Sequence, residues 1–251
     1  MLDRGEEVWY NVPVMKNREA KGQKAEKRGW NMLFQHMDRI VFAGDSVTDV
    51  GRAQPRGEGL FDNLGHGYVR MIDNMLAAYY PELAIRVTNA GISGHTSRDL
   101  LERFDRDVID LHPDYISICI GINDVWRQFD CAAMPDYAVF PEEYENNVRE
   151  MILKSKAVAK KVFLLTPYYM EPLRDDPMRR RMDEYCDICR KLAKEEDCVL
   201  VDLQEMFDSY FRFRHSASVA WDRVHPNEKG ATLIAKTFLS HVDFDPHHIP
   251  Q

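Results

Sequence analysis

The sequence predicts an α/β protein, a single-domain three-layer α/β/α sandwich with a five-stranded parallel sheet. Short apolar runs alternate along the chain with longer amphipathic stretches, which is the pattern of strands and helices in alternation. Each amphipathic stretch is also long enough to be the crossover helix that two parallel strands require. The length of 251 residues fits one domain of this class, because a single core still grows at that size.

The predicted strands are five short runs rich in apolar residues. Their continuous apolar character is typical of strands that helices cover on both faces. The runs are residues 39–43 (RIVFA), 84–89 (AIRVTN), 115–120 (YISICI), 161–165 (KVFLL) and 198–202 (CVLVD). In an open parallel sheet, ligands bind beyond the carboxyl ends of the strands, so we expect the chemistry in the residues that follow these runs.

The predicted helices lie between these strands and after the last one. In each stretch the apolar residues recur at the spacing of one helix face. The stretches are residues 68–79, 97–110, 141–159 and 177–196, and a last helix is expected to open after Pro226.

Composition separates the chain into three parts. They are an N-terminal extension (1–36), the α/β domain (37–242) and a C-terminal tail (243–251). The extension is rich in charged residues and lacks apolar periodicity. It is either an appendage, disordered or anchored by Trp9, Tyr10 and Trp30, or an artefact of a translation start that truly falls at Met32 or Met37.

Charge and composition exclude several classes of partner. The net charge is −8, from 33 basic and 41 acidic residues, and this charge repels phosphate backbones and anionic lipids. No stretch approaches the roughly 20 apolar residues that span a bilayer, and the first residues lack the apolar core of a signal peptide. We therefore expect no nucleic-acid or membrane partner and a cytoplasmic location. The cysteines form an odd set of five, for which reduced thiols are the simplest interpretation.

A candidate nucleophile follows the first predicted strand. The strand ends in GDSVTD, in which Gly44 permits a sharp turn and Ser46 lies where an open α/β sheet presents its site. The alternative is that Asp45, Ser46 and Thr48 only cap the following segment, as such residues often do.

Two further loops supply candidate hydrogen-bond donors. After the second strand comes NAGISGHTSRDL, whose Gly91 and Gly94 can bring main-chain N–H groups close to a ligand. The alternative is a strand-to-helix loop in which Thr96 or Ser97 caps the next helix. The third strand ends in GINDVW, which delivers the carboxamide of Asn123 to the same edge of the sheet. Asn is also common in turns for local reasons.

The fourth element is the loop WDRVHPNEKG before the last helix. Asp222 and His225 are three positions apart, so the carboxylate can accept from one imidazole nitrogen while the other nitrogen faces a nucleophile. Taken alone, a His beside a Pro is more often structural than catalytic.

Together these four blocks resemble those of the SGNH (GDSL-type) hydrolases, a family named for its Ser, Gly, Asn and His. The resemblance implies the flavodoxin-like fold of that family, with Ser46 as nucleophile and Asp222 with His225 as the orienting and proton-accepting pair. It implies an oxyanion hole made by the main-chain N–H groups of Ser46 and Gly94 and the side chain of Asn123. No GxSxG motif of the other common α/β serine hydrolases is present.

A longer likeness extends to the bacterial acetylxylan esterases of this family. It is carried by GRAQPRGEG, GYVRMIDNMLAAYYPELAIRV, GINDVWRQFD, TPYYMEPLRDDPMRRRMDEY and AWDRVHPN. It implies hydrolysis of acetyl esters on xylo-oligosaccharides or related sugars, with no metal or organic cofactor. A homo-oligomer and a monomer are both kept as alternatives. Substrate is expected to contact Asp45, Trp126 and Trp221, which lie in or beside these blocks. The alternative for the two indoles is that they pack the rim of the site or a subunit interface.

Two alternatives to this function stay open at this point. One is a broad short-chain carboxylesterase or thioesterase, and the other is a catalytically silent carbohydrate-binding relative. Two remaining patterns are interpreted as structural. Cys186 and Cys189 form a single CxxC on a predicted helix. The tail holds the possible metal ligands His241, Asp243, Asp245, His247 and His248, but chain ends are usually mobile and solvated.

Overall fold

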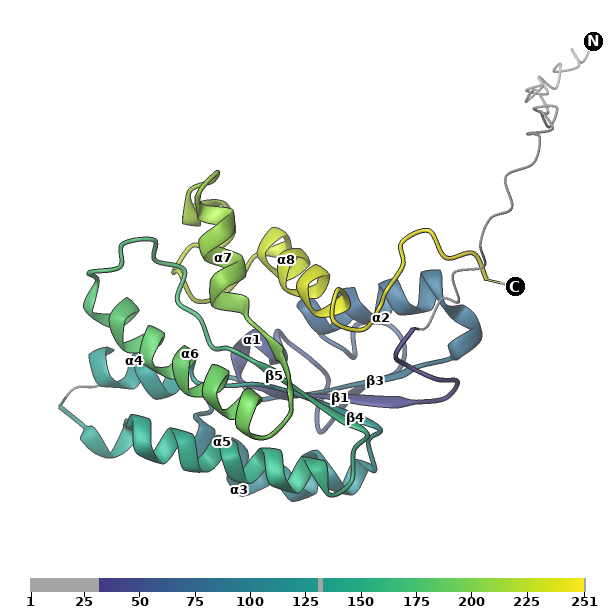
Figure 1. Ribbon diagram of the computed structural model, residues 1–251, viewed down its shortest axis with the longest axis horizontal. Coiled ribbons are helices and arrows are strands. Elements are labelled where there is room, and N and C mark those ends of the chain that lie inside the picture. The colour runs from purple at the N-terminus through teal and green to yellow at the C-terminus, as the bar shows by residue number, and fades with distance from the viewer. Residues whose placement is uncertain (1–31, 131–132, 251) are drawn as a thin grey trace, which may run out of the picture. The chain divides into compact units, whose positions relative to one another are not determined.

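A six-stranded sheet forms the centre of the computed structural model, which describes residues 32–130 and 133–250 (Figure 1). The strand order is β2-β3-β1-β4-β5-β6. The strands are β1 (Arg39–Gly44), β2 (Gly57–Glu58), β3 (Arg86–Gly91), β4 (Tyr115–Cys119), β5 (Lys161–Leu165) and β6 (Val199–Val201). The five predicted strands pair in parallel, which confirms the predicted fold class. The prediction missed β2, a two-residue strand antiparallel to β3, because two residues are too few to show a periodicity.

Without β2, the parallel strands follow the order second, first, third, fourth and fifth along the sheet. This is the order of the flavodoxin-like fold, in which the winding direction reverses between the first and third parallel strands. In this chain these two strands are β1 and β4. The register brings their ends level, since Gly44 lies opposite both Gly91 of β3 and Cys119 of β4. The loops that follow β1, β3 and β4 therefore leave the sheet side by side.

Helices cover both faces of this sheet. They are α1 (Ser46–Asp49), α2 (Tyr68–Tyr79), α3 (Ser97–Asp107), α4 (Ile122–Asp130), α5 (Pro141–Lys156), α6 (Pro177–Glu195), α7 (Leu203–Phe211) and α8 (Glu228–Leu239). Short 3₁₀ turns are η1 (Pro81–Leu83), η2 (Ile109–Leu111), η3 (Pro135–Tyr137) and η4 (Ser216–Ser218). The predicted helices correspond to α2, α3 with η2, α5, α6 and α8, whereas α1, α4 and α7 were not predicted.

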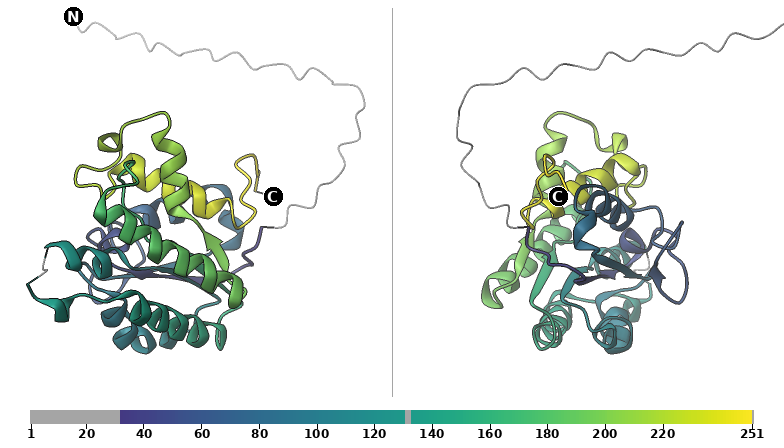
Figure 2. Two further views of the ribbon diagram at one scale, coloured as in Figure 1. Left: turned by 60° about the vertical axis from the view of Figure 1, so that its left-hand side comes forward. Right: turned by 90° about the vertical axis from the view of Figure 1, so that its right-hand side faces the viewer.

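The side-chain alternation of β1 shows how the two cores are separated. Ile40 and Phe42 join the cluster that includes α2, α7 and α8. Val41 and Ala43 point the other way, into the cluster of α3, α5 and α6. In Figure 1, α2 and α8 lie above the sheet and α3 and α5 below it, and Figure 2 shows the same layers from two further directions.

The ends of the described segment also pack on this domain. Phe34 is 2% exposed and meets Tyr115 edge to face with ring centroids 4.8 Å apart, so the packed unit begins before residue 37. The rest of the predicted extension, residues 1–31, lies outside the described residues. In the tail, His248 stacks on Tyr80 at 4.2 Å and hydrogen-bonds Glu82.

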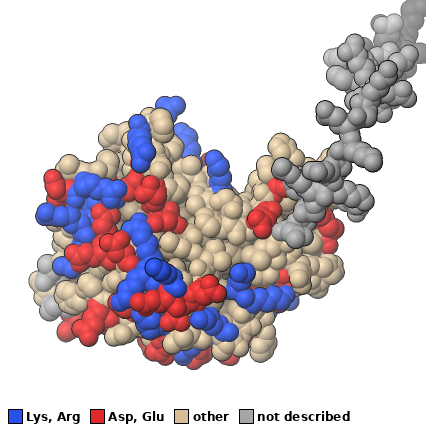
Figure 3. All heavy atoms as spheres, viewed as in Figure 1, with Lys and Arg blue, Asp and Glu red and all other residues tan. Residues whose placement is uncertain are grey.

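Surface charges on the face shown in Figure 3 are of both signs and intermixed. Among residues 32–130 and 133–250, no helix is long and apolar enough to cross a lipid bilayer. No group of three or more His, Cys, Asp or Glu side chains within these residues is placed to hold a metal ion.

Candidate active site

A cleft of about 510 Å³ opens at the carboxyl edge of the sheet. It is lined by Ser46, Val50, Ser93, Gly94, Asn123, Trp126, Arg127, His225 and Pro226. The predicted residues Ser46, Gly94 and Asn123 come from the loops after β1, β3 and β4, and His225 comes from the loop before α8. The cleft thus lies at the point where the winding of the sheet reverses, where α/β folds of this kind bind their ligands.

Ser46 is the first residue of α1 and follows β1 directly. A Cβ atom on Gly44 would overlap the side chain of Thr48 and the carbonyl oxygen of Cys119, so glycine is needed for the strand to turn this closely into α1. Asp45 caps α1, because its Oδ1 accepts from the N–H of Val47 at 2.9 Å. The capping interpretation therefore holds for Asp45, and it leaves the hydroxyl of Ser46 free to face the cleft.

Ser46, His225 and Asp222 form one chain of hydrogen bonds. Ser46 Oγ lies 2.8 Å from His225 Nε2, and His225 Nδ1 lies 2.5 Å from Asp222 Oδ2. The other carboxylate oxygen of Asp222 accepts from the N–H groups of Val224 at 3.0 Å and His225 at 2.8 Å.

Burial by itself raises the pKa of Asp222, but the hydrogen bonds from His225 and Val224 outweigh it, and the net pKa is lower than usual. Asp222 is then an ionised group that only accepts, so the proton of the imidazole lies on Nδ1. Nε2 is left to accept the proton of Ser46.

The carboxamide of Asn123 is oriented by two neighbours. Its Nδ2 donates to the carbonyl oxygen of His95 at 2.9 Å, and its Oδ1 accepts from Arg127 Nη2 at 3.2 Å. These two contacts fix which end of the amide is the donor, and the second N–H of Nδ2 remains available to a ligand. Asn123 lies in the first turn of α4, so the alternative of an Asn that serves only a local turn does not describe it.

Gly94 has a backbone φ of +84°, and a Cβ atom there would meet nothing within 4 Å. Glycine is thus required for its backbone conformation and not for space. Neither its N–H nor that of Ser46, which is in the first turn of α1, donates to another described residue. The loop is held in place by Ser93, whose N–H and Oγ both donate to Asp49 of α1 at 3.0 and 2.7 Å. Thr96 caps α3 in a capping box with Asp99, which confirms the helix-cap interpretation of Thr96.

The three residues predicted to contact substrate are placed differently. Trp126 lines the cleft, and its ring lies 6.0 Å from the ring of His225. Trp221 is 95% exposed and does not line the cleft. Asp45 is buried and does not line the cleft, and burial raises the pKa of Asp45 to about 7.

Several residues of the site were missed by the sequence analysis. Asp49 holds the loop of Ser93, and Arg127 orients the side chain of Asn123, as described above. Asp124 is fully buried and accepts from the N–H of Ser97 at 3.0 Å, which ties α4 to the start of α3, and burial raises its pKa to about 7. Both acids stand inside the quoted blocks GDSVTD and GINDVW, but their partners lie too far away in sequence to be recognised there.

The CxxC cysteines are structural. Cys186 and Cys189 are buried on α6, and burial raises the pKa of both thiols, that of Cys189 to about 12. Thiols of this kind are unreactive. The Sγ of Cys186 donates to the carbonyl oxygen of Pro167 at 3.1 Å.

An α/β/α sheet with a serine, a histidine and a carboxylate linked at its carboxyl edge, beside an oriented amide, is the arrangement of hydrolases that act through a serine. Comparison with known proteins agrees with this class. The GDSL-like lipase/acylhydrolase family matches residues 42–233. An acetylxylan esterase of Geobacillus stearothermophilus is 46% identical over 208 residues, which are 83% of this chain and 95% of that protein. An acetylxylan esterase of Xylanibacter ruminicola is 24% identical over 224 residues, and these cover 79% of this chain but 42% of that protein.

Solved structures agree as well. The crystal structure of the Geobacillus stearothermophilus acetylxylan esterase matches with a TM-score of 0.83 and 45% identity, covering 85% of this chain and 98% of that one. Matching structures of the same enzyme include catalytic mutants in which a serine, an aspartate or a histidine is replaced by alanine. An α/β hydrolase from the metagenome of Lake Arreo, Spain, matches with a TM-score of 0.82 and 47% identity, covering 84% of this chain and 97% of that one. The chain therefore belongs to the GDSL-like lipase/acylhydrolase family and is a carboxylic ester hydrolase.

Proposed function

We propose that this chain is a serine esterase that removes acetyl groups from xylo-oligosaccharides or related sugars. The observation that carries the proposal is the hydrogen-bonded chain from Ser46 through His225 to Asp222, which opens into the cleft. In this chain the carboxylate of Asp222 orients the imidazole so that Nε2 faces the hydroxyl of Ser46, which is the geometry that acyl transfer needs.

The reaction proceeds in two acyl-transfer steps. In the first, His225 accepts the proton of Ser46 as Oγ attacks the ester carbonyl, and it then passes that proton to the departing sugar hydroxyl. In the second, His225 accepts a proton from the water that attacks the acetyl-serine, and it returns this proton to Ser46 Oγ as acetate leaves.

Negative charge on the carbonyl oxygen is stabilised by three donors. They are the main-chain N–H groups of Ser46 and Gly94 and the Nδ2 of Asn123. The N–H groups donate to no other described residue, and the Asn123 amide is already oriented by His95 and Arg127. Donors fixed before the reaction stabilise the oxyanion without having to reorganise.

The acetyl-sugar substrate is the finer part of the proposal. One relative that matches over 95% of its own length is an acetylxylan esterase, and matching structures of that enzyme describe it as an acetyl-xylooligosaccharide esterase. In this chain Trp126 offers an indole at the cleft, with the guanidinium of Arg127 5.4 Å from the ring centroid. Sugar rings commonly pack their C–H faces against such an indole and take hydrogen bonds from a neighbouring polar group.

The test combines one variant with a series of substrates. Acetate release from acetylated xylo-oligosaccharides is measured for the unmodified chain and for Ser46→Ala, and 4-nitrophenyl esters of increasing acyl length are compared in parallel. We expect Ser46→Ala to lose at least about 10⁴-fold in kcat, because it removes the nucleophile. We also expect acetyl esters to react faster than octanoyl esters. Activity that survives in Ser46→Ala would place the nucleophile elsewhere, and faster octanoyl hydrolysis would favour a general carboxylesterase over a deacetylase.

A further inference from the structure

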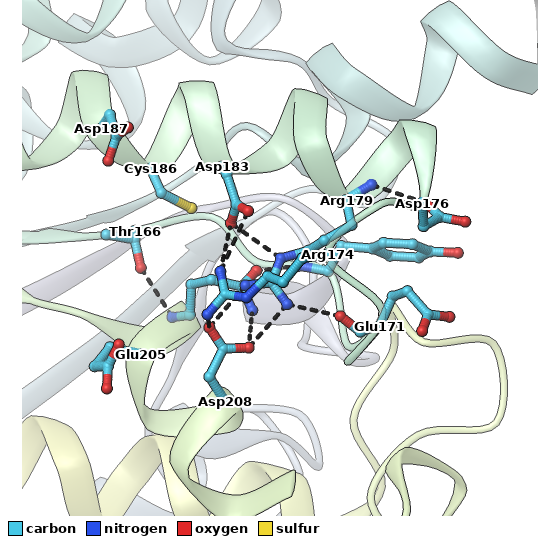
Figure 4. A network of polar contacts seen from close by, with 12 residues as sticks. Thr166, Glu171, Arg174, Asp176, Arg179, Asp183, Cys186, Asp187, Glu205 and Asp208 are labelled. Atoms are coloured by element: carbon cyan, nitrogen blue, oxygen red, sulfur yellow. Dashed lines mark hydrogen bonds and ion pairs between the residues drawn. The ribbon is translucent and has the colours of Figure 1, made fainter.

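A fully buried arginine lies behind the active site, at the start of α6. The side chain of Arg179 is 0% exposed. Both its Nη atoms pair with the carboxylate of Asp208 on α7, at 2.8 and 2.7 Å, and its Nε donates to Asp183 at 2.9 Å. Its Nη1 also donates to the main-chain carbonyl of Glu171 at 2.6 Å. Figure 4 shows this network, with Arg179 between Asp208, Asp183 and Glu171.

Such a network fixes the relative positions of the groups it joins more than it adds to the free energy of unfolding. Removing a guanidinium from water costs several kcal/mol, and the paired carboxylates do little more than offset that penalty. A planar guanidinium with bidentate partners does, however, fix directions closely. The carbonyl of Glu171 is therefore held at a defined place relative to α6 and α7. The same segment is held a second time, since the N–H of Tyr169 donates to Gln204 Oε1 at 2.8 Å.

Residues 169–171 in turn hold Arg223, the neighbour of Asp222. The N–H of Met170 donates to the carbonyl oxygen of Arg223 at 2.8 Å, and the carboxylate of Glu171 pairs with the Arg223 guanidinium. The side chain of Glu171 is 12% exposed and that of Arg223 is 47% exposed, so the carboxylate is shielded from water while the guanidinium reaches the surface. We call these two contacts to Arg223 the 170–223 tether.

Arg223 adopts a backbone conformation that a non-glycine residue rarely takes, with φ at +65°. This left-handed conformation is unfavourable for a residue with a Cβ atom and persists only where the surroundings hold it. Here it turns the N–H groups of Val224 and His225 onto Asp222 Oδ1, and it places Oδ2 on His225 Nδ1. The position of the imidazole thus follows from the conformation of Arg223.

We propose that Glu171 and Arg223 are positioning residues for the Asp222–His225 pair. The 170–223 tether, anchored by Arg179, holds Arg223 in its left-handed conformation and keeps His225 Nε2 within hydrogen-bond distance of Ser46 Oγ. The inference rests on the proposed function, because it assigns the tether a role in the reaction of that same site. A displacement of about 1 Å at a reacting group can lower a rate by about 10²-fold, so a tether of this kind has a measurable effect on kcat.

The test uses Glu171→Gln, Arg223→Met, their double variant and the conservative Arg223→Lys. Glu184→Gln is the matched control, since Glu184 forms an exposed pair with Arg181 on the same helix as Arg179. Kinetics are measured on 4-nitrophenyl acetate, and thermal unfolding is recorded for each variant. We expect Glu171→Gln and Arg223→Met each to lower kcat by about 10- to 100-fold with KM changed by less than about threefold. The double variant should be no slower than the slower single variant, and Arg223→Lys should recover most of the activity.

Other outcomes overturn the inference. They are kcat values of the two single variants equal to that of Glu184→Gln, a change confined to KM, or effects of the two substitutions that multiply in the double variant. Should Glu171→Gln fail to fold, Arg223→Met and Arg223→Lys are read by the same criteria. Ser46→Ala is measured beside them. An inactive Ser46→Ala with unaffected tether variants would reject the tether alone, whereas an active Ser46→Ala would reject the proposed function.

Discussion

At the scale of single residues, Asn123 shows how neighbours prepare a side chain for chemistry. His95 and Arg127 occupy its amide from two sides, so the remaining N–H has one direction to point. A donor of this kind strengthens its bond as the carbonyl oxygen becomes an oxyanion, and it contributes little to binding of the neutral ester.

Replacement of Asn123 by Ala should therefore act on kcat. We expect a decrease of about 10²–10³-fold, the usual effect of losing one oxyanion donor, with a much smaller change in KM. Steady-state kinetics on 4-nitrophenyl acetate provide the measurement. Asn74→Ala, which removes a carboxamide from the exposed side of α2, is the control and should leave both constants unchanged. An effect of Asn123→Ala on KM alone would assign this residue to substrate binding.

At the scale of elements, the junction of β1 and α1 contains a buried acid. Asp45 caps α1 and is 1% exposed, and burial raises its pKa from 3.8 to about 7. The negative charge of buried Asp124 contributes to this rise of the pKa, while the hydrogen bond from Val47 and the charge of Arg103 oppose it. Between pH 3.8 and about pH 7, Asp45 keeps its proton in the folded chain but releases it in the unfolded chain. The stability that Asp45 contributes is thus present below about pH 3.8 and is lost as the pH rises to about 7.

Asp45→Asn should remove this dependence, because an amide resembles the protonated acid and caps a helix equally well. We expect the variant to gain stability over the parent chain as the pH is raised from 5 to 7, and the difference to level off above about pH 7. Denaturant unfolding of both chains across this range gives the free energies. If the two curves stay parallel, Asp45 does not retain a proton in the fold.

Helix and strand boundaries were predictable where the apolar pattern was long. The strand at 161–165 and the helix at 68–79 have the bounds that the sequence indicated, since the first is a continuous apolar run that ends before Thr166-Pro167 and the second an amphipathic stretch that ends before Pro81. By contrast, α4 was missed because it begins only three residues after β4 ends and its first turn, INDV, has the composition of a turn. Similarly, β2 exists only because β3 lies beside it.

At the scale of the whole molecule, residues 32–250 supply both cores and every residue of the cleft. We therefore predict that deleting residues 1–31 leaves folding and activity nearly unchanged. Deleting residues 1–36 is the comparison variant, because this deletion also removes Phe34, whose ring is buried against Tyr115. Loss of a buried aromatic ring costs about 3–5 kcal/mol, so only the longer deletion should lower the melting temperature markedly. Loss of soluble protein on the shorter deletion would contradict this prediction.

Family and fold were recognisable at this scale, because the blocks around Ser46, Gly94, Asn123 and His225 are local in sequence. The homo-oligomeric state and the cytoplasmic location stay predictions. Trp221 is 95% exposed and does not line the cleft, so both its contact with substrate and its place in a subunit interface stay predictions.

The sequence by itself determined the class of fold, its parallel strands and the short blocks that carry the candidate chemistry. These depend on spacing along the chain, through the periods of helix and strand and through turns of a few residues. Only the tertiary structure decided which polar groups are buried and what holds them. Asp45 beneath the cleft, Arg127 on Asn123 and Arg179 behind the Asp222 loop are ordinary charged residues in the sequence. Their surroundings come from segments far apart along the chain, as when Arg179 meets Asp208 29 positions away, and burial is a property of those surroundings.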